Sequence, residues 1–172
     1  MASFARICLT GPESTGKTEL AEVLGRHFGV EVVPEFARAY ALEHGRDLTY
    51  DDCEPIARGE LANIDGAARP AILDTDLIST VVYSRYYYGR CPEWVVEEAR
   101  RRRADLYLLM DTDIEWRPDP ARDAGGDARE DLFDVFRAAM DEFDVKFVIV
   151  SGSGEERVAR AVEAIEELRI EN

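Results

Sequence analysis

The sequence has 172 residues, a formal net charge of −15 and a hydrophobic content of 46%. This content argues against disorder, and the length suits one domain, which we expect to span residues 1–172. No stretch approaches the roughly 20 apolar residues of a membrane span, and the N-terminus does not resemble a signal peptide. We therefore expect a cytoplasmic protein with no membrane partner, and the acidic charge also disfavours nucleic acid as a partner.

Short apolar runs alternate along the chain with segments of helical periodicity. In chain order we predict a strand at 7–9, a helix at 17–28, a strand at 30–33, helices at 35–44 and 51–68, a strand at 71–73, helices at 77–88 and 92–103, a strand at 106–110, a helix at 128–143, a strand at 145–150 and a helix at 154–170. This alternation favours an α/β fold, with a five-stranded parallel sheet and helices on both faces. Three acidic side chains of the 51–68 helix, Glu54, Glu60 and Asp65, are expected on a solvated face.

The segment 111–127 has no apolar periodicity and is interrupted by proline and glycine. Long irregular segments are uncommon in compact domains and are usually functional, so we expect a lid here. Trp116 is a candidate for stacking on a substrate ring. Arg122 is a candidate for bringing positive charge to a phosphoryl-transfer transition state, although a solvated loop charge is the alternative for any single arginine.

Residues 11–18, GPESTGKT, match the phosphate-binding pattern G-x-x-x-x-G-K-[ST] without a gap. The motif lies between a predicted strand and a predicted helix, as its mechanism requires, because loop N–H groups and a helix N-terminus together bind anions. We expect ATP and Mg²⁺ as cofactors, with Lys17 on the β- and γ-phosphates and Thr18 on the metal. The expected nucleotide site contains Gly11, Glu13, Ser14, Thr15, Gly16, Lys17 and Thr18, together with Ser151 and Gly152 in the turn after the fifth strand.

Acidic residues also follow the second and third predicted strands, whose ends should face the phosphate loop. Glu35 is a candidate general base for a substrate hydroxyl, and Arg38 could steady the substrate or the phosphate; a dipole-favoured glutamate with a surface ion pair is the alternative. One of Asp74 and Asp76 should contact Mg²⁺, and the other should hold a sugar hydroxyl or cap the next helix. Spacing does not decide between them; we take Asp74 for the metal and both for the substrate.

Four tyrosines crowd the end of the 77–88 helix, and their spacing cannot place all of them in the core. We take Tyr87 as the candidate for stacking on a substrate ring, with core packing as the alternative. A phosphate loop, two acidic strand ends and an arginine-bearing lid are typical of small nucleoside and nucleotide kinases. We then expect a small-molecule substrate, a nucleoside such as a riboside or a nucleotide; the alternative is a P-loop ATPase with a regulatory role. The sequence does not decide between a monomer and a homo-oligomer.

With these parts in order, the chain resembles the kinase domain of the NadR-type ribosylnicotinamide kinases. The matching stretches are 11–18, 34–38 (PEFAR), 74–76 (DTD), 86–89 (YYYG) and 115–119 (EWRPD) running into Arg122. The resemblance implies a nucleotide-kinase-like fold with a lid, and ATP-dependent phosphorylation of nicotinamide riboside to nicotinamide mononucleotide in NAD salvage. Full-length members also carry an adenylyltransferase domain, whose H-x-G-H motif is absent here, so we expect the kinase domain only.

Overall fold

The computed structural model describes residues 4–118 and 128–171. The elements in these ranges are β1 (Arg6–Thr10), α1 (Lys17–Phe28), β2 (Glu31–Val33), α2 (Phe36–His44), the short 3-10 helix η1 (Tyr50–Asp52), α3 (Cys53–Gly66), β3 (Ala71–Asp74), α4 (Leu77–Tyr88), α5 (Glu93–Arg101), β4 (Leu106–Met110), α6 (Ala128–Glu142), β5 (Phe147–Val150) and α7 (Gly154–Glu171). The predicted α/β fold is confirmed. None of the described helices is long and apolar enough to cross a bilayer.

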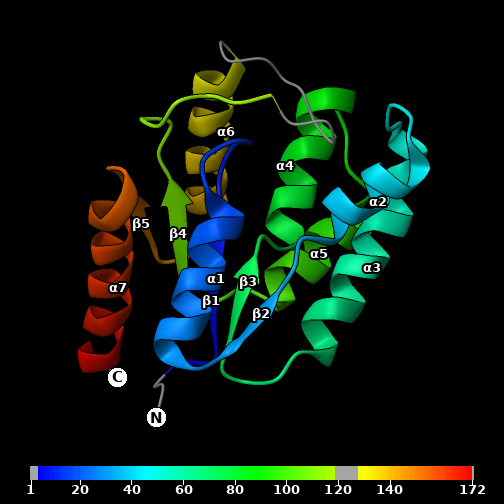
Figure 1. The fold of residues 1–172 in the computed structure, drawn as a ribbon. Helices are drawn as coiled ribbons and strands as arrows, with labels where there is room; N and C mark the ends of the chain where they lie inside the picture. The colour runs from blue at the N-terminus through cyan, green and yellow to red at the C-terminus, as the bar shows by residue number, and fades with distance from the viewer. Residues whose placement is uncertain (1–3, 119–127, 172) are drawn as a thin grey trace.

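The five strands form one parallel sheet in the order β2-β3-β1-β4-β5. Helices cover both faces, and α1 and α7 lie together on one of them (Figure 1). Parallel strands all end at the same edge, so the loops after β1, β2 and β3 meet there. In Figure 1 this is the upper edge, where the chain after β4 passes over the loop between β1 and α1.

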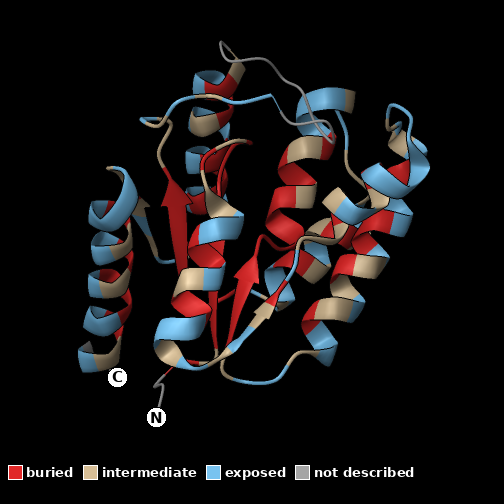
Figure 2. Cartoon of the chain, in the orientation of Figure 1, coloured by how far each residue is buried: buried red, intermediate tan, exposed pale blue. Residues whose placement is uncertain are grey.

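Alternate residues of β1 serve the two halves of the core. Ile7 and Leu9 pack with residues of α1 and α7, whereas Cys8 packs with residues of α3 to α6. Figure 2 shows that the central strands are buried throughout, as uninterrupted apolar runs predict for strands covered on both faces. The edge strands are less covered, because Glu31 of β2 and Val148 of β5 are exposed.

The predicted solvated face on α3 is wrong for Glu60. Its side chain is buried, whereas Glu54 and Asp65 of the same helix are about half exposed. The cause is the close approach of α2: a Cβ on Gly59 would lie 2.2 Å from the Phe36 ring. Since only glycine leaves that space, α3 packs directly against the start of α2 and covers Glu60.

Candidate active site

The phosphate loop joins β1 to α1 in a conformation that depends on its glycines. Gly11 has φ +127°, and a Cβ there would lie 3.1 Å from the carbonyl oxygen of Met110. Gly16 has φ +78°, and Ser14 between them also lies in the left-handed region, at φ +56°. Other residues adopt such angles at a cost, so the motif's glycines are required for the curl of the loop.

The Lys17 ammonium lies inside this curl. Its Nζ donates to the carbonyl oxygens of Gly11, at 2.9 Å, and Pro12, at 2.5 Å. The side chain therefore lies across the loop at the N-terminus of α1, where backbone N–H groups and the helix dipole favour an anion. This geometry fits the phosphate-binding role that the sequence predicts for Lys17.

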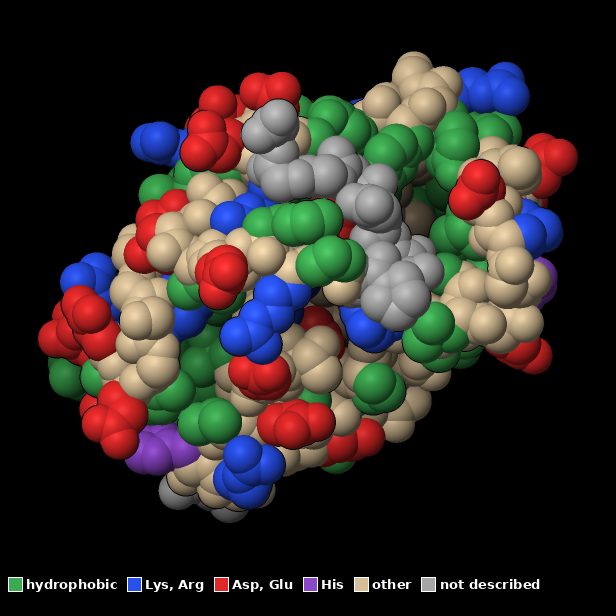
Figure 3. Space-filling view, turned by 45° about the horizontal axis from the view of Figure 1, so that its top comes forward, with side chains coloured by type: hydrophobic (Ala, Val, Ile, Leu, Met, Phe, Trp, Pro, Cys, Tyr) green, Lys and Arg blue, Asp and Glu red, His purple; other side chains and the backbone are tan. Residues whose placement is uncertain are grey.

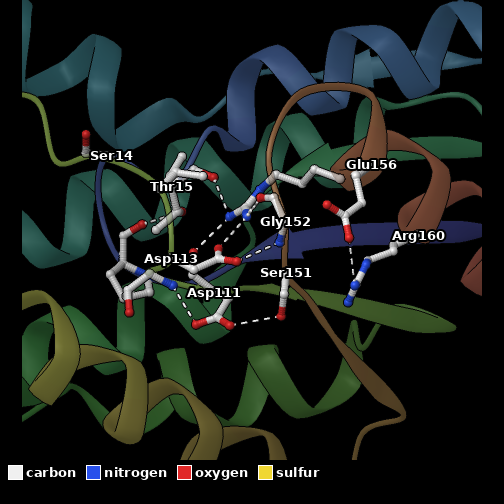
Figure 4. Close-up of polar contacts among 12 residues, drawn as sticks. Ser14, Thr15, Asp111, Asp113, Ser151, Gly152, Glu156 and Arg160 are labelled. Atoms are coloured by element: carbon white, nitrogen blue, oxygen red, sulfur yellow. Dashed lines mark hydrogen bonds and ion pairs between the residues drawn. The ribbon is translucent and has the colours of Figure 1, made fainter.

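Two buried arginines, whose structural role the sequence did not predict, donate hydrogen bonds to backbone carbonyl oxygens of the phosphate loop. Arg157 of α7 is one of them, and its surroundings are drawn in Figure 4. Its guanidinium donates to the carbonyl oxygens of Thr15 (3.0 Å), Asp111 (2.8 Å) and Gly152 (2.7 Å), and it pairs with Asp113 at 2.9 Å. One side chain thus ties the phosphate loop to the ends of β4 and β5.

Arg129 of α6 is the second buried arginine, and it ties the phosphate loop to the chain after β4. It donates to the carbonyl oxygens of Ser14 (3.1 Å), Thr112 (3.0 Å) and Ile114 (2.7 Å). The start of the predicted lid is therefore anchored to the phosphate loop, and the backbone N–H of Arg117 adds a 2.8 Å bond to Ser14 Oγ. Arg122 lies outside the described residues.

Thr18 and Asp74 form the candidate metal site. Thr18 Oγ1 donates to Asp74 Oδ2 at 2.7 Å, and Asp74 Oδ1 is buried without a hydrogen-bond partner among the described residues. Burial raises the pKa of the Asp74 carboxyl, and the Thr18 bond partly offsets this. No cluster of three or more His, Cys, Asp or Glu side chains suited to a metal occurs in the described part of the chain. A hydroxyl and one carboxylate fit Mg²⁺, which takes its other ligands from phosphates and water.

Asp76 caps helix α4. Its Oδ1 accepts from the backbone N–H of Ile78 at 3.0 Å, at the start of α4, and its Oδ2 accepts from the Tyr107 hydroxyl at 2.5 Å. The side chain is buried and is not among the residues that line the cavities described next. Burial raises its pKa to about 6. The helix cap, one of the two alternatives for the second aspartate, is therefore present at Asp76, and its contact with the substrate stays a prediction.

Two cavities open at the carboxyl edge of the sheet. The phosphate cavity, of about 480 Å³, is lined by the phosphate loop together with Arg38 and Arg117. The acceptor cavity, of about 670 Å³, lies between α2, α3 and α4. Glu35 lines both. Glu35 is the N-cap residue of α2, where its side chain makes no capping bond, and it lies where the two cavities meet.

Aromatic side chains form one wall of the acceptor cavity. The rings of Tyr83 and Tyr87 stack with centroids 6.0 Å apart and an interplanar angle of 7°, and both line the cavity. The Tyr87 hydroxyl reaches Glu13 of the phosphate loop at 3.4 Å. Figure 3 views this end of the molecule, where acidic and basic side chains are interspersed over the surface.

Three other predicted site residues are not among those that line either cavity. Trp116 is half-buried and is not among the described residues that line either one. Ser151 Oγ donates to Asp111 at 2.9 Å, and the Gly152 N–H donates to Asp113 at 2.6 Å (Figure 4). The turn after β5 is thus bound to the end of β4, and its contact with a nucleotide stays a prediction.

A family profile described as an AAA domain, AAA_28, matches residues 6–157. The chain belongs to this family. This AAA domain is 29% identical to the Trifunctional NAD biosynthesis/regulator protein NadR of Escherichia coli (strain K12), over 94% of its own length and 42% of the relative's. It therefore spans less than half of that protein.

Solved structures similar to this AAA domain include a NadR protein in complex with NR, with a TM-score of 0.75 and 25% identity, covering 95% of this chain and 50% of that one. A thymidylate kinase from Ehrlichia chaffeensis has a TM-score of 0.71 and 13% identity over 94% of this chain and 98% of its own. The second likeness shows that the AAA domain has the fold of a nucleotide kinase.

Proposed function

We propose that the chain is an ATP-dependent kinase that phosphorylates nicotinamide riboside to nicotinamide mononucleotide. The observation that carries this proposal is the position of Glu35, a residue that lines both the phosphate cavity and the acceptor cavity. A P-loop ATPase that transfers phosphate to water needs no second cavity with an acidic group at the junction. The similarity to a NadR protein in complex with NR, which we take as nicotinamide riboside, supports this acceptor.

The proposed reaction is a direct phosphoryl transfer. The acceptor's primary hydroxyl oxygen attacks the γ-phosphorus of ATP, the bond from that phosphorus to the β–γ bridging oxygen breaks, and ADP leaves. Glu35 accepts the hydroxyl proton as the new bond forms, which is the role of a general base. Lys17 holds the β- and γ-phosphates in line with the acceptor, and the lid arginine Arg122 adds positive charge to the transferring group.

The cofactors proposed are ATP and Mg²⁺. The Thr18 hydroxyl and the Asp74 carboxylate would hold the metal, which supplies charge neutralisation on the phosphates. The buried Asp74 Oδ1, without a hydrogen-bond partner among the described residues, supports this assignment. Arg38 and Arg117 line the phosphate cavity and are placed to contact the nucleotide phosphates.

The test is ADP release by the purified chain with ATP and Mg²⁺, in the presence and absence of nicotinamide riboside. We expect the riboside to stimulate ADP release strongly and nicotinamide mononucleotide to appear in equal amount by mass spectrometry. Comparable rates with uridine or adenosine would instead indicate a general nucleoside kinase. ADP release that no riboside changes would indicate an ATPase and overturn the proposal.

A further inference from the structure

Glu60 is a buried carboxyl group inside the acceptor cavity. It is 2% exposed and lines the cavity together with Glu35. Its Oε2 accepts from the backbone N–H of Phe36 at 3.1 Å, whereas its Oε1 is buried with no hydrogen-bond partner among the described residues. A buried carboxylate oxygen without a partner is costly, so native structures normally supply one. The missing partner of Glu60 therefore suggests a ligand.

Among the described residues, the groups that act most strongly on Glu60 include no cation. Arg46 is the only basic side chain of the described residues that lines the acceptor cavity. Its guanidinium donates two hydrogen bonds of 2.8 Å to the carboxylate of Asp52. The acidic groups that act on Glu60 are Glu35 at the start of α2, and Asp74 and Asp76 at the end of β3 and the start of α4.

Burial, followed by the charge of Glu35, raises the pKa of Glu60 well above its usual value. The backbone N–H of Phe36 acts in the opposite direction but does not outweigh burial. The charged form of Glu60 is thus disfavoured, because burial and the negative charges of the described groups that act on it work in the same direction. A cationic ligand would instead favour the charged form.

The aromatic wall of the same cavity suits a flat cation. Tyr83 and Tyr87 line the cavity with stacked rings, and the face of an aromatic ring attracts positive charge. A planar ring that carries a positive charge would gain from this wall and from the acidic groups. A neutral ring of the same shape would gain only from the wall.

We infer that Glu60 is a specificity-determining residue of the acceptor cavity, where its carboxylate favours an acceptor with a positively charged ring over a neutral one of the same shape. This inference rests on the proposed function, because a ribosyl pyridinium such as nicotinamide riboside is the cationic acceptor concerned. Glu60 and Glu35 have different roles. Glu35 accepts the proton of the acceptor hydroxyl, whereas Glu60 favours an acceptor whose ring is positively charged.

The test compares two acceptors that differ in ring charge: nicotinamide riboside and its 1,4-dihydro form, whose ring is neutral. Dissociation constants by calorimetry and kcat/KM are measured for the unmodified chain and for Glu60→Gln. The glutamine side-chain oxygen can still accept the hydrogen bond from the backbone N–H of Phe36. The substitution therefore removes the charge and keeps this hydrogen bond. We expect the preference for the cationic acceptor to fall about tenfold or more, while ATP affinity stays unchanged.

Two controls separate charge from structure. Glu54→Gln removes an exposed charge from the same helix and should leave the preference intact, and Glu60→Asp keeps the buried charge and should keep the sign of the preference. A Glu60→Gln variant that loses both acceptors equally, or that keeps the full preference, overturns the inference while leaving the proposed function standing. An unmodified chain that binds neither acceptor overturns the proposed function and this inference with it.

Discussion

The hydroxyl of Thr18, at the start of α1, donates a 2.7 Å hydrogen bond to Asp74 at the end of β3. The two residues are 56 positions apart in the sequence and meet because β1 and β3 are neighbours in a parallel sheet. A hydroxyl and a carboxylate that already touch need little rearrangement to share a metal ion. This pairing supports the proposal that these two residues hold Mg²⁺.

Asp74→Asn should lower kcat by about 100-fold or more, because the metal loses its only carboxylate in the proposed site. The free chain should not be destabilised, since burial disfavours the charged form of Asp74 and the substitution removes that charge. The measurement is a Mg²⁺ titration of kinase activity together with thermal melting. A variant with normal activity at the same Mg²⁺ concentration would contradict the assignment of the metal site.

Arg157→Met should raise KM for ATP about tenfold or more and lower the melting temperature by several degrees. The carbonyl oxygens of Thr15, Asp111 and Gly152 would lose their donor, at roughly 1–3 kcal/mol for each that stays buried and unpaired. Arg160→Met, on the same helix but with a side chain 51% exposed, is the control and should change neither quantity. Unchanged ATP affinity in Arg157→Met would show that the loop keeps its shape without this anchor.

Asp52→Asn should reduce stability in a pH-dependent way. Asp52 accepts from Arg46, Tyr40 and Thr49, and the Arg46 guanidinium is the main cause of its lowered pKa. A lowered folded-state pKa adds stability above the unfolded value, near pH 4, which is lost as the pH falls through the folded-state value. The expected difference is roughly 1–3 kcal/mol at pH 7 and smaller at pH ~3.

Urea unfolding of the unmodified chain and Asp52→Asn at both pH values measures this difference, with Asp51→Asn as the exposed neighbouring control. Because residues 45–49 also line the acceptor cavity, the Asp52 variant should bind the acceptor more weakly as well. A stability difference that is the same at both pH values would rule out the ionised Asp52 as its source.

Arg122→Ala should lower kcat by about 10³–10⁵, which is the rate factor contributed by arginines that stabilise a phosphoryl-transfer transition state. The affinity for ATP should change much less. The reason is that a lid arginine acts on charge that develops in the transition state. Steady-state kinetics and direct ATP binding measure the two effects separately. Weaker ATP binding with kcat intact would identify Arg122 as a binding residue only.

Much of the site follows from local rules that a sequence displays directly. The phosphate-loop motif and the acidic residues after the second and third strands could be predicted to meet, because parallel strands end at one edge of a sheet. Which of Asp74 and Asp76 serves the metal could not be predicted. Asp74 is the last residue of β3 and Asp76 lies two positions later, and the hydrogen bond from the Tyr107 hydroxyl of β4 shows that Asp76 faces the interior.

The buried charges were harder to predict, although helical spacing held a signal for them. Glu60 lies four residues from both Ile56 and Ile64, which are buried on the inner face of α3. Arg157 likewise lies four residues before the buried Ala161. Charged residues usually mark the solvated face of a helix, so their residue type argued against burial although their spacing allowed it. Their hydrogen-bond partners come from distant parts of the chain, which the spacing within one helix does not reveal.

The most direct test of the account is Glu35→Gln, assayed for phosphoryl transfer to nicotinamide riboside alongside a separate titration of ATP binding. The substitution keeps the size of the side chain at the junction of the two cavities and removes the base. We expect kcat to fall by about 10²–10⁴, with ATP affinity close to that of the unmodified chain. Full transfer activity in Glu35→Gln would contradict the claim that this carboxylate joins the nucleotide site to the acceptor.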